Sequence, residues 1–141
     1  MDIRPFIGGD LPFLSVIDLQ GYENPWGEPT IKQYSGSIIV AEINDRPQGY
    51  ACLEAQNSQA RLLRLAVSRE HRRTGIGSAL MERVLAEVRA FKKLTTLISE
   101  SNLAGQCFLR KHGWKCVNSS VADAFEICGK KENGFFFVRK L

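Results

Sequence analysis

The residues best suited to chemistry lie in a basic loop with two glycines, Arg72-Arg73-Thr74-Gly75-Ile76-Gly77. An apolar, strand-like run leads into this loop, and an amphipathic helix is predicted to begin directly after it. Backbone N–H groups in the first turn of a helix lack partners within the helix, and the helix dipole adds partial positive charge there. Glycines remove side chains that would keep a phosphate away. The loop is therefore predicted to bind a pyrophosphate group.

Two common nucleotide-binding loops do not fit this run. A P-loop needs GxxxxGK[ST], and no Lys-Ser or Lys-Thr follows Gly77. A dinucleotide-binding loop needs GxGxxG after the first strand and an acidic residue about 20 positions later. Here Leu80 stands at the third glycine position, and Thr95 and Thr96 stand where the acid is needed. A nucleoside triphosphate and a dinucleotide are therefore excluded as the expected ligand.

The elements that must position the loop follow from hydrophobic periodicity and turn signals. Asp10 is an expected N-cap for the first helix, and Asn102 and Gly113 are expected at the start and end of the last one. The strand over 94–99 follows the long helix and is expected to run parallel to the strand over 61–67. Residues 119–133 are polar and receive no assignment. Strands are predicted over 2–6, 37–44, 48–54, 61–67, 94–99, 114–118 and 134–140, and helices over 10–20, 30–35, 76–91 and 102–111.

Composition narrows the class of protein. A chain of 141 residues fits one domain, 1–141, with a single core. The net charge of +4 comes from scattered residues without a reader motif, so we expect no nucleic-acid partner. We expect no metal site, because the four cysteines show no metal-ligand spacing; they indicate reduced thiols in the cytoplasm. No leader segment or run of about 18 apolar residues is found, so no membrane association is expected.

The loop matches the pattern [RQ]xxGxG/A, with the strand LLRLAV before it and a helix after it. It resembles the acyl-coenzyme A signature of the GCN5-related N-acetyltransferases (GNAT). The run SESNLAGQCFLRKHGWK resembles the family's second landmark, an Asn that opens a helix ending in Gly and an aromatic residue. The resemblance implies an α+β fold with a mostly antiparallel, twisted sheet of six to seven strands, a splayed parallel central pair and about four flanking helices.

The resemblance also implies acetyl-coenzyme A as co-substrate. The N–H groups around Arg73 to Gly77 would hold its pyrophosphate, and the strand and the second landmark would hold its pantetheine arm from two sides. Alternatives stay open: the glycines can serve a tight turn alone, Arg73 can be solvated, and Asn102 can be an ordinary cap. The expected coenzyme-binding residues are Leu65, Val67, Arg72, Arg73, Thr74, Gly75, Ile76, Gly77 and Asn102.

The catalytic groups depart from the family pattern. The resemblance implies direct attack of an amine on the thioester, with backbone N–H groups near Leu65 to Val67 polarising the carbonyl. The usual tyrosine acid is replaced by Leu109; neighbouring Cys107 is a conceivable donor, although a buried apolar role is favoured. The strand segment 61–64 has no carboxylate, so Glu100 is the best candidate base, acting directly or through water. A surface role for Glu100 stays open, and Glu54 is a weaker candidate.

A weak base favours an acceptor that is already partly neutral. An α-amine of pKa 7.7 to 8.0 is roughly 10 to 15 percent neutral at pH 7, against about 0.04 percent for lysine. Asn24-Pro25-Trp26 resembles an element of the ribosomal-protein-alanine N-acetyltransferase branch, although Trp26 can also serve packing. Small-molecule amines stay open as acceptors. Two other functions also stay open, a catalytically weak acyl-coenzyme A-binding module and an interaction protein. The apolar strand over 134–141 suits a homodimer interface or burial under helices.

Overall fold

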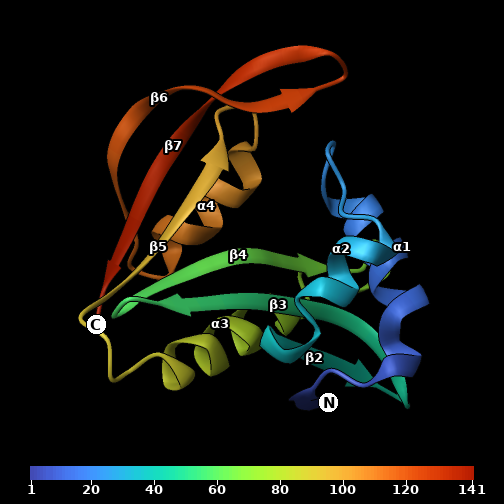
Figure 1. The fold of residues 1–141 in the computed structure, drawn as a ribbon. Coiled ribbons are helices and arrows are strands. Elements are labelled where there is room, and N and C mark those ends of the chain that lie inside the picture. The colour runs from blue at the N-terminus through green and yellow to red at the C-terminus, as the bar shows by residue number, and fades with distance from the viewer.

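One seven-stranded sheet, in the order β1-β2-β3-β4-β5-β7-β6, organises the chain (Figure 1). This computed structural model describes the backbone of residues 1–141 and every side chain except that of residue 119. All neighbouring strands are antiparallel except β4 and β5, which are parallel. The expected mixed fold is thus confirmed. The strands are β1 (Asp2–Pro5), β2 (Ile38–Ile43), β3 (Arg46–Gln56), β4 (Gln59–Val67), β5 (Lys93–Ser99), β6 (Lys115–Ile127) and β7 (Lys130–Lys140).

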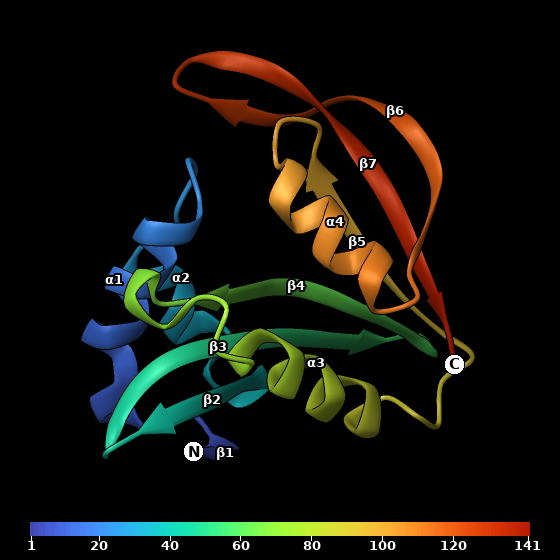
Figure 2. The same cartoon turned by 180° about the vertical axis from the view of Figure 1, so that it is seen from behind.

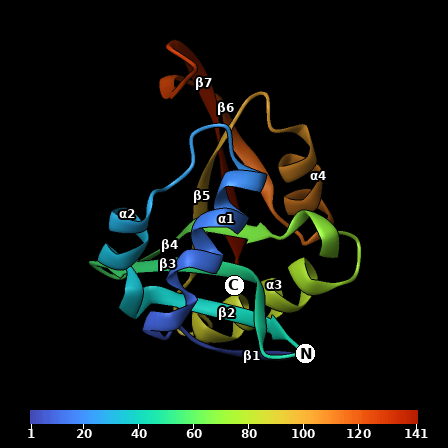
Figure 3. The same cartoon turned by 90° about the vertical axis from the view of Figure 1, so that its right-hand side faces the viewer.

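Helices cover both faces of the sheet (Figure 3). The helices α1 (Leu11–Gly21) and α2 (Glu28–Gln33) pack on one face, where Val40, Tyr50 and Cys52 point. The helices α3 (Ile76–Glu87) and α4 (Leu103–Lys111) share the other cluster, with Ile39 and Ala51. Strands alternate their side chains between faces, so β2 and β3 supply both clusters at once. None of the described helices has the length and apolar character needed to cross a membrane.

The parallel strands β4 and β5 form ladder pairs only at their beginning. Their register comprises Ala60 with Leu94 and Arg61 with Thr95, and the two strands then diverge (Figure 1). On its other side β4 pairs with β3 throughout, but the register shifts and leaves Leu63 without a partner. An extra residue of this kind is a β-bulge, which bends its strand. The bulge lies where β4 turns away from β5 and opens the sheet.

Local signals gave most elements correctly. Of the apolar residues at helical spacing in the predicted helix over 76–91, Ile76, Leu80, Val84 and Val88 are buried, whereas Phe91 follows the end of α3 and is partly buried. Gly113 follows α4 with a φ of +85°, as expected of a residue just past a helix end. The helix predicted over 30–35 instead spans Glu28–Gln33, because Pro29 fits the first turn, where its missing N–H has no cost.

One segment without a predicted structure is now defined, and two sequence-based expectations are corrected. Residues 119–133 belong to the long β6–β7 hairpin, whose turn at Cys128 and Gly129 has positive φ at both positions. Asp10 precedes α1 as expected, but its carboxylate accepts hydrogen bonds from Arg4 rather than capping the helix, since a bidentate charged pair is the stronger interaction. Cys107 is exposed, because it lies on the outer face of α4. Figure 2 shows the hairpin extending past β5 toward the end where the α1–α2 loop lies.

Candidate active site

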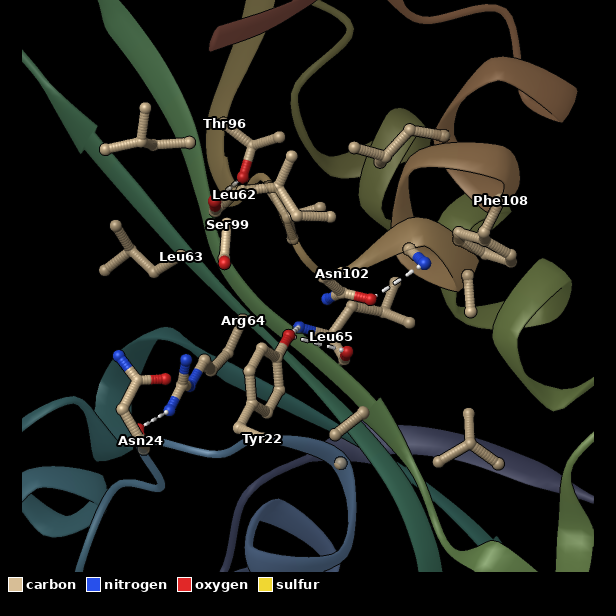
Figure 4. Close-up of a pocket in the computed structure, with 18 of the residues that line it drawn as sticks. Tyr22, Asn24, Leu62, Leu63, Arg64, Leu65, Thr96, Ser99, Asn102 and Phe108 are labelled. Atoms are coloured by element: carbon tan, nitrogen blue, oxygen red, sulfur yellow. Dashed lines mark hydrogen bonds between the residues drawn. The ribbon is translucent and has the colours of Figure 1, made fainter. Parts of the chain in front are cut away.

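A cavity of about 310 Å³ opens where β4 and β5 diverge (Figure 4). One wall is the second half of β4, and the opposite wall is the end of β5 with the first turns of α4. The α1–α2 loop closes one side through Tyr22 and Asn24. Of the residues predicted from the sequence to bind a ligand, Leu65, Val67, Arg72 and Asn102 line this cavity.

The backbone of β4 presents polar groups toward the opening. Leu65 donates its N–H to the Tyr22 hydroxyl oxygen (3.3 Å), and the same hydroxyl donates to the Leu65 carbonyl oxygen (3.0 Å). The Val67 carbonyl oxygen accepts from Arg72 Nε (3.4 Å). These groups need partners because β5 has moved away from them. Both expected strand residues therefore face the cavity, but side chains of this protein already satisfy them.

The glycine loop lies beyond Arg72, at the start of α3. Gly75 is the N-cap of α3 with a φ of +89°, a left-handed conformation in which glycine avoids the strain of a side chain. The first backbone bond of α3 runs from Ala79 N–H to the Gly75 carbonyl oxygen. The N–H groups of Ile76, Gly77 and Ser78 precede that bond and lack partners within the helix, so an anion can accept from them. Arg73 to Gly77 do not line the cavity itself.

The two glycines and Arg72 have distinct roles in this loop. A Cβ at Gly75 would meet nothing within 4 Å, so space is open there. A Cβ at Gly77 would lie 3.2 Å from the Phe108 ring, so this glycine allows α3 and α4 to approach closely. Arg72 donates to the carbonyl oxygens of Val67 and Gln20 and has no carboxylate partner among the described residues. Its positive charge therefore remains available to an anion at the mouth of the cavity.

The start of α4 forms the facing wall. Asn102 Oδ1 accepts from Gly105 N–H (3.0 Å), so the predicted N-cap is confirmed. A Cβ at Gly105 would lie 2.6 Å from Ile98 Cδ1 and 2.9 Å from Asn102 Oδ1. Glycine at this position thus permits both the cap and the close approach of α4 to β5. Contact between Asn102 and a ligand stays a prediction.

A buried polar network of side chains from α1, β3 and β4 lies next to Tyr22 in the cavity wall. The fully buried Asp18 carboxylate accepts from Tyr50 Oη (2.6 Å) and Arg64 Nη2 (3.1 Å), and Arg64 Nη2 also donates to the Asn24 carbonyl oxygen (2.8 Å). The Arg64 guanidinium lies 3.7 Å from the centre of the Tyr22 ring. Burial raises the pKa of Tyr50, and the adjacent Asp18 carboxylate raises it further. This network fixes Tyr22 at the cavity.

Sequence reasoning missed this network, although one signal was present. Asp18 follows the apolar spacing of Leu14 and Ile17 on α1, and a carboxylate on a buried helix face requires a buried partner. That partner, Arg64, is 46 residues away on β4. No local pattern connects the two positions.

The acid–base candidates are sparse. Leu109 is only 5% exposed and lines the cavity, so an apolar side chain occupies the position where the family pattern has tyrosine. Glu100 is exposed and outside the cavity lining, and its Oε1 accepts from Asn133 N–H (3.4 Å). Glu54 pairs with Arg61 (3.6 Å) near the β3–β4 turn, far along β4 from Leu65. Among the described side chains, no carboxylate lines the cavity between β4 and β5.

Glu132, a carboxylate that was not identified from the sequence, lies beside the cavity wall. Glu132 Oε1 accepts from the Ser99 hydroxyl and from Ser101 N–H (2.8 Å), and Ser99 lines the cavity. Hydrogen bonds from Ser101 and Ser99 hold the pKa of Glu132 below its ordinary value. A smaller cavity of about 170 Å³ adjoins this point and is lined by Glu23, Ser101 and Asn102. The acidic side of the site is thus formed by the α1–α2 loop and the β6–β7 hairpin.

Comparison with known proteins gives concordant matches. A model of the acetyltransferase (GNAT) domain matches residues 34–116. An uncharacterized N-acetyltransferase of Methanocaldococcus jannaschii is 31% identical over 86 residues, which cover 58% of this chain and 55% of that protein. The chain thus matches about half the length of this curated relative.

Solved structures share the fold. The ribosomal-protein-S18-alanine N-acetyltransferase from Escherichia coli superposes with a TM-score of 0.86 at 21% identity, covering 99% of this chain and 92% of that one. Arabidopsis thaliana Naa50, in complex with the bisubstrate analogue CoA-Ac-MVNAL, has a TM-score of 0.82 at 16% identity, covering 99% and 98%. At identities of 21% and 16% these superpositions show a shared fold, that is, the same arrangement of helices and strands.

Proposed function

The chain belongs to the acetyltransferase (GNAT) domain family, and from this premise we propose that it transfers an acetyl group from acetyl-coenzyme A to a primary amine. One observation carries the proposal: the cavity between the diverging β4 and β5 adjoins a glycine loop that opens a helix. A chain of amides that ends in a pyrophosphate matches this combination, because amides can pair with the strand backbone and the phosphates with helix N–H groups. The family relationship supports the same donor.

The coenzyme would lie across the cavity toward α3. The pantetheine arm would pair with the backbone of Leu65 and Val67 on one side and meet Asn102 on the other. The pyrophosphate would accept from N–H groups of the loop from Arg73 through Thr74, Gly75 and Ile76 to Gly77, beside the unpaired charge of Arg72. The bound analogue of the Naa50 structure, which contains CoA, supports this choice of ligand.

The chemistry is direct attack of a neutral amine on the thioester carbonyl. Because Leu109 cannot donate a proton, the coenzyme A thiol must leave as the anion, which a thiol of pKa about 8.5 permits. An acceptor with an α-amino group suits a site whose cavity lacks a lining carboxylate, because part of that amine is neutral at pH 7. The acceptor, a peptide N-terminus or a small-molecule amine, would enter between the α1–α2 loop and the β6–β7 hairpin, beside Glu23 and Glu132.

We retain Glu100 as the proposed base. Because Glu100 is exposed and does not line the cavity, it would have to act through a water molecule. We also propose a cytoplasmic location, supported by the four free cysteines. A homodimer stays a proposal: β7 is an interior strand, and the full burial of Phe137 in the core accounts for part of its apolar character.

The decisive assay measures thiol release from acetyl-coenzyme A in the presence of peptides with different N-termini, free amino acids, polyamines and aminoglycosides. Turnover above hydrolysis with at least one acceptor is expected, with peptides and other α-amines ahead of lysine-like amines. The specific observation of Leu109 in the cavity favours one alternative, an acyl-coenzyme A-binding module. Micromolar coenzyme binding without turnover in the whole panel would establish that alternative, and absence of coenzyme binding would refute both.

A further inference from the structure

Tyr22 brings a hydroxyl group to the strand that is proposed to hold the acyl donor. It is the C-cap residue of α1, where its N–H donates to the Asp18 carbonyl oxygen (3.0 Å). Its side chain reaches the cavity wall (Figure 4), and its hydroxyl bonds to both polar backbone groups of Leu65. The Leu65 N–H donates to this hydroxyl over a long 3.3 Å, so an incoming oxygen atom can accept the N–H while the hydroxyl stays beside it.

The Arg64 guanidinium packs against the face of the Tyr22 ring and restricts the movement of this side chain. Arg64 lies 3.7 Å from the ring centre and is only 7% exposed. Arg64 is itself fixed by the Asp18 carboxylate and the Asn24 carbonyl oxygen. A ring held between a buried guanidinium and a strand backbone keeps its hydroxyl in one place. A ligand oxygen at the Leu65 N–H must therefore lie beside this hydroxyl.

We propose that the Tyr22 hydroxyl and the Leu65 N–H together form the oxyanion hole for the thioester carbonyl of the acyl donor. The inference rests on the proposed function and adds a side-chain donor to it. When the donor binds, its carbonyl oxygen takes the Leu65 N–H, and the Tyr22 O–H turns from the Leu65 carbonyl oxygen to the same ligand oxygen. An amide N–H of the pantetheine arm replaces the hydroxyl at the Leu65 carbonyl, so no backbone group is left without a partner.

The reaction then proceeds without proton transfer from Tyr22. The amine nitrogen forms a bond to the carbonyl carbon, and the electron pair of the C=O bond moves onto oxygen, where two donors stabilise the charge. As the C=O bond re-forms, the C–S bond breaks and coenzyme A leaves as thiolate; the surplus amine proton passes to water. Burial raises the pKa of Tyr22, whereas a thiol titrates near 8.5, so protonation of the sulfur by Tyr22 is uphill. Tyr22 acts as a fixed hydrogen-bond donor.

The test uses acetyl-coenzyme A labelled with ¹³C at the thioester carbonyl and isotope-edited infrared spectroscopy of the binary complex, with no acceptor present. Hydrogen bonds to a carbonyl lower its stretching frequency. We expect a lowered frequency in the wild-type complex and a partial return toward the unbonded value in Tyr22→Phe. In the acetyl-transfer assay kcat should fall by about 10²- to 10³-fold, as for the loss of one oxyanion-hole donor, while the Kd for acetyl-coenzyme A changes less than about threefold.

Tyr34→Phe is the matched control, because it also removes a tyrosine hydroxyl. The Tyr34 ring stacks on Trp26, and Tyr34 does not line the cavity. This variant should leave both the frequency and kcat unchanged. S-ethyl-coenzyme A, a thioether without the carbonyl oxygen, should bind wild type and Tyr22→Phe equally, which also shows that the variant is folded. If Tyr22→Phe does not fold, the wild-type spectrum decides alone: a carbonyl frequency no lower than in an aprotic solvent overturns the proposal.

Other outcomes separate the inference from its premise. An unchanged carbonyl frequency in folded Tyr22→Phe refutes the oxyanion hole but leaves acetyl transfer intact. A loss of rate at high pH in wild type that Tyr22→Phe abolishes would make Tyr22 a proton donor and likewise refute the proposal. Failure of acetyl-coenzyme A to bind wild type would refute the proposed function, and the inference with it.

Discussion

Gly75 offers the sharpest test of the loop, through two substitutions that differ only in charge. Gly75→Asn and Gly75→Asp place side chains of equal size where a Cβ meets nothing within 4 Å. Both residues tolerate positive φ better than other side chains do, so each should lower the free energy of unfolding by only about 1 kcal/mol. The difference between the two variants in acetyl-coenzyme A affinity then reports the charge at the ligand.

The size of that difference follows from Coulomb's law. A carboxylate about 6 Å from one unit of pyrophosphate charge is repelled by about 0.7 kcal/mol in water and by about 2.8 kcal/mol at an effective dielectric constant near 20. Because Gly75 is exposed, the lower figure applies, and two phosphate charges double it to about 1.4 kcal/mol. Gly75→Asp should therefore bind acetyl-coenzyme A about tenfold more weakly than Gly75→Asn.

Isothermal titration calorimetry at two salt concentrations measures both constants. The ratio should shrink as salt rises, since the Debye length is about 10 Å at 0.1 M and about 3 Å at 1 M. Dephospho-coenzyme A, which keeps the pyrophosphate but lacks the 3′-phosphate, should show the same ratio. Equal affinity of the two variants at low salt would refute the assignment of the pyrophosphate to this loop.

Three further predictions concern the base, the buried network and acid stability. Glu100→Gln should lower kcat/KM and leave an acidic limb set by the acceptor amine alone, and an unchanged kcat/KM–pH profile would show that Glu100 is not the base. Asp18→Ala should cost about 3–5 kcal/mol in urea unfolding because it leaves Arg64 buried and unpaired, and Arg64→Met should cost less in that background than alone. Burial opposes ionisation of Asp10, but the bonds from Arg4 and Ile7 N–H outweigh it and lower its pKa. Its stabilising effect should be complete above about pH 4 and disappear as pH falls further; Asp10→Asn should flatten this part of the stability–pH curve.

The parts of the site that follow from local spacing could be predicted. Gly75 and Asn102 were placed correctly at helix starts, because a turn with positive φ and a side-chain cap depend on a few adjacent residues. The β6–β7 hairpin was missed because Cys128 is an uncommon residue at a position with positive φ. Cys107 was expected to be buried, but small residues on a short helix carry little information about which face is inside.

The amino-acid sequence by itself determined the glycine loop, the cap of α4 and the family, since these depend on residue type and spacing along a few turns. Only the tertiary structure decided that Tyr22 bonds to Leu65, that Asp18 pairs with Arg64, and that Glu100 accepts from Asn133 N–H outside the cavity lining. These contacts join segments more than 30 residues apart or depend on the bulge at Leu63, which sets how β4 leaves β5. Strand register and packing are properties of the whole sheet, and no short stretch of sequence contains them.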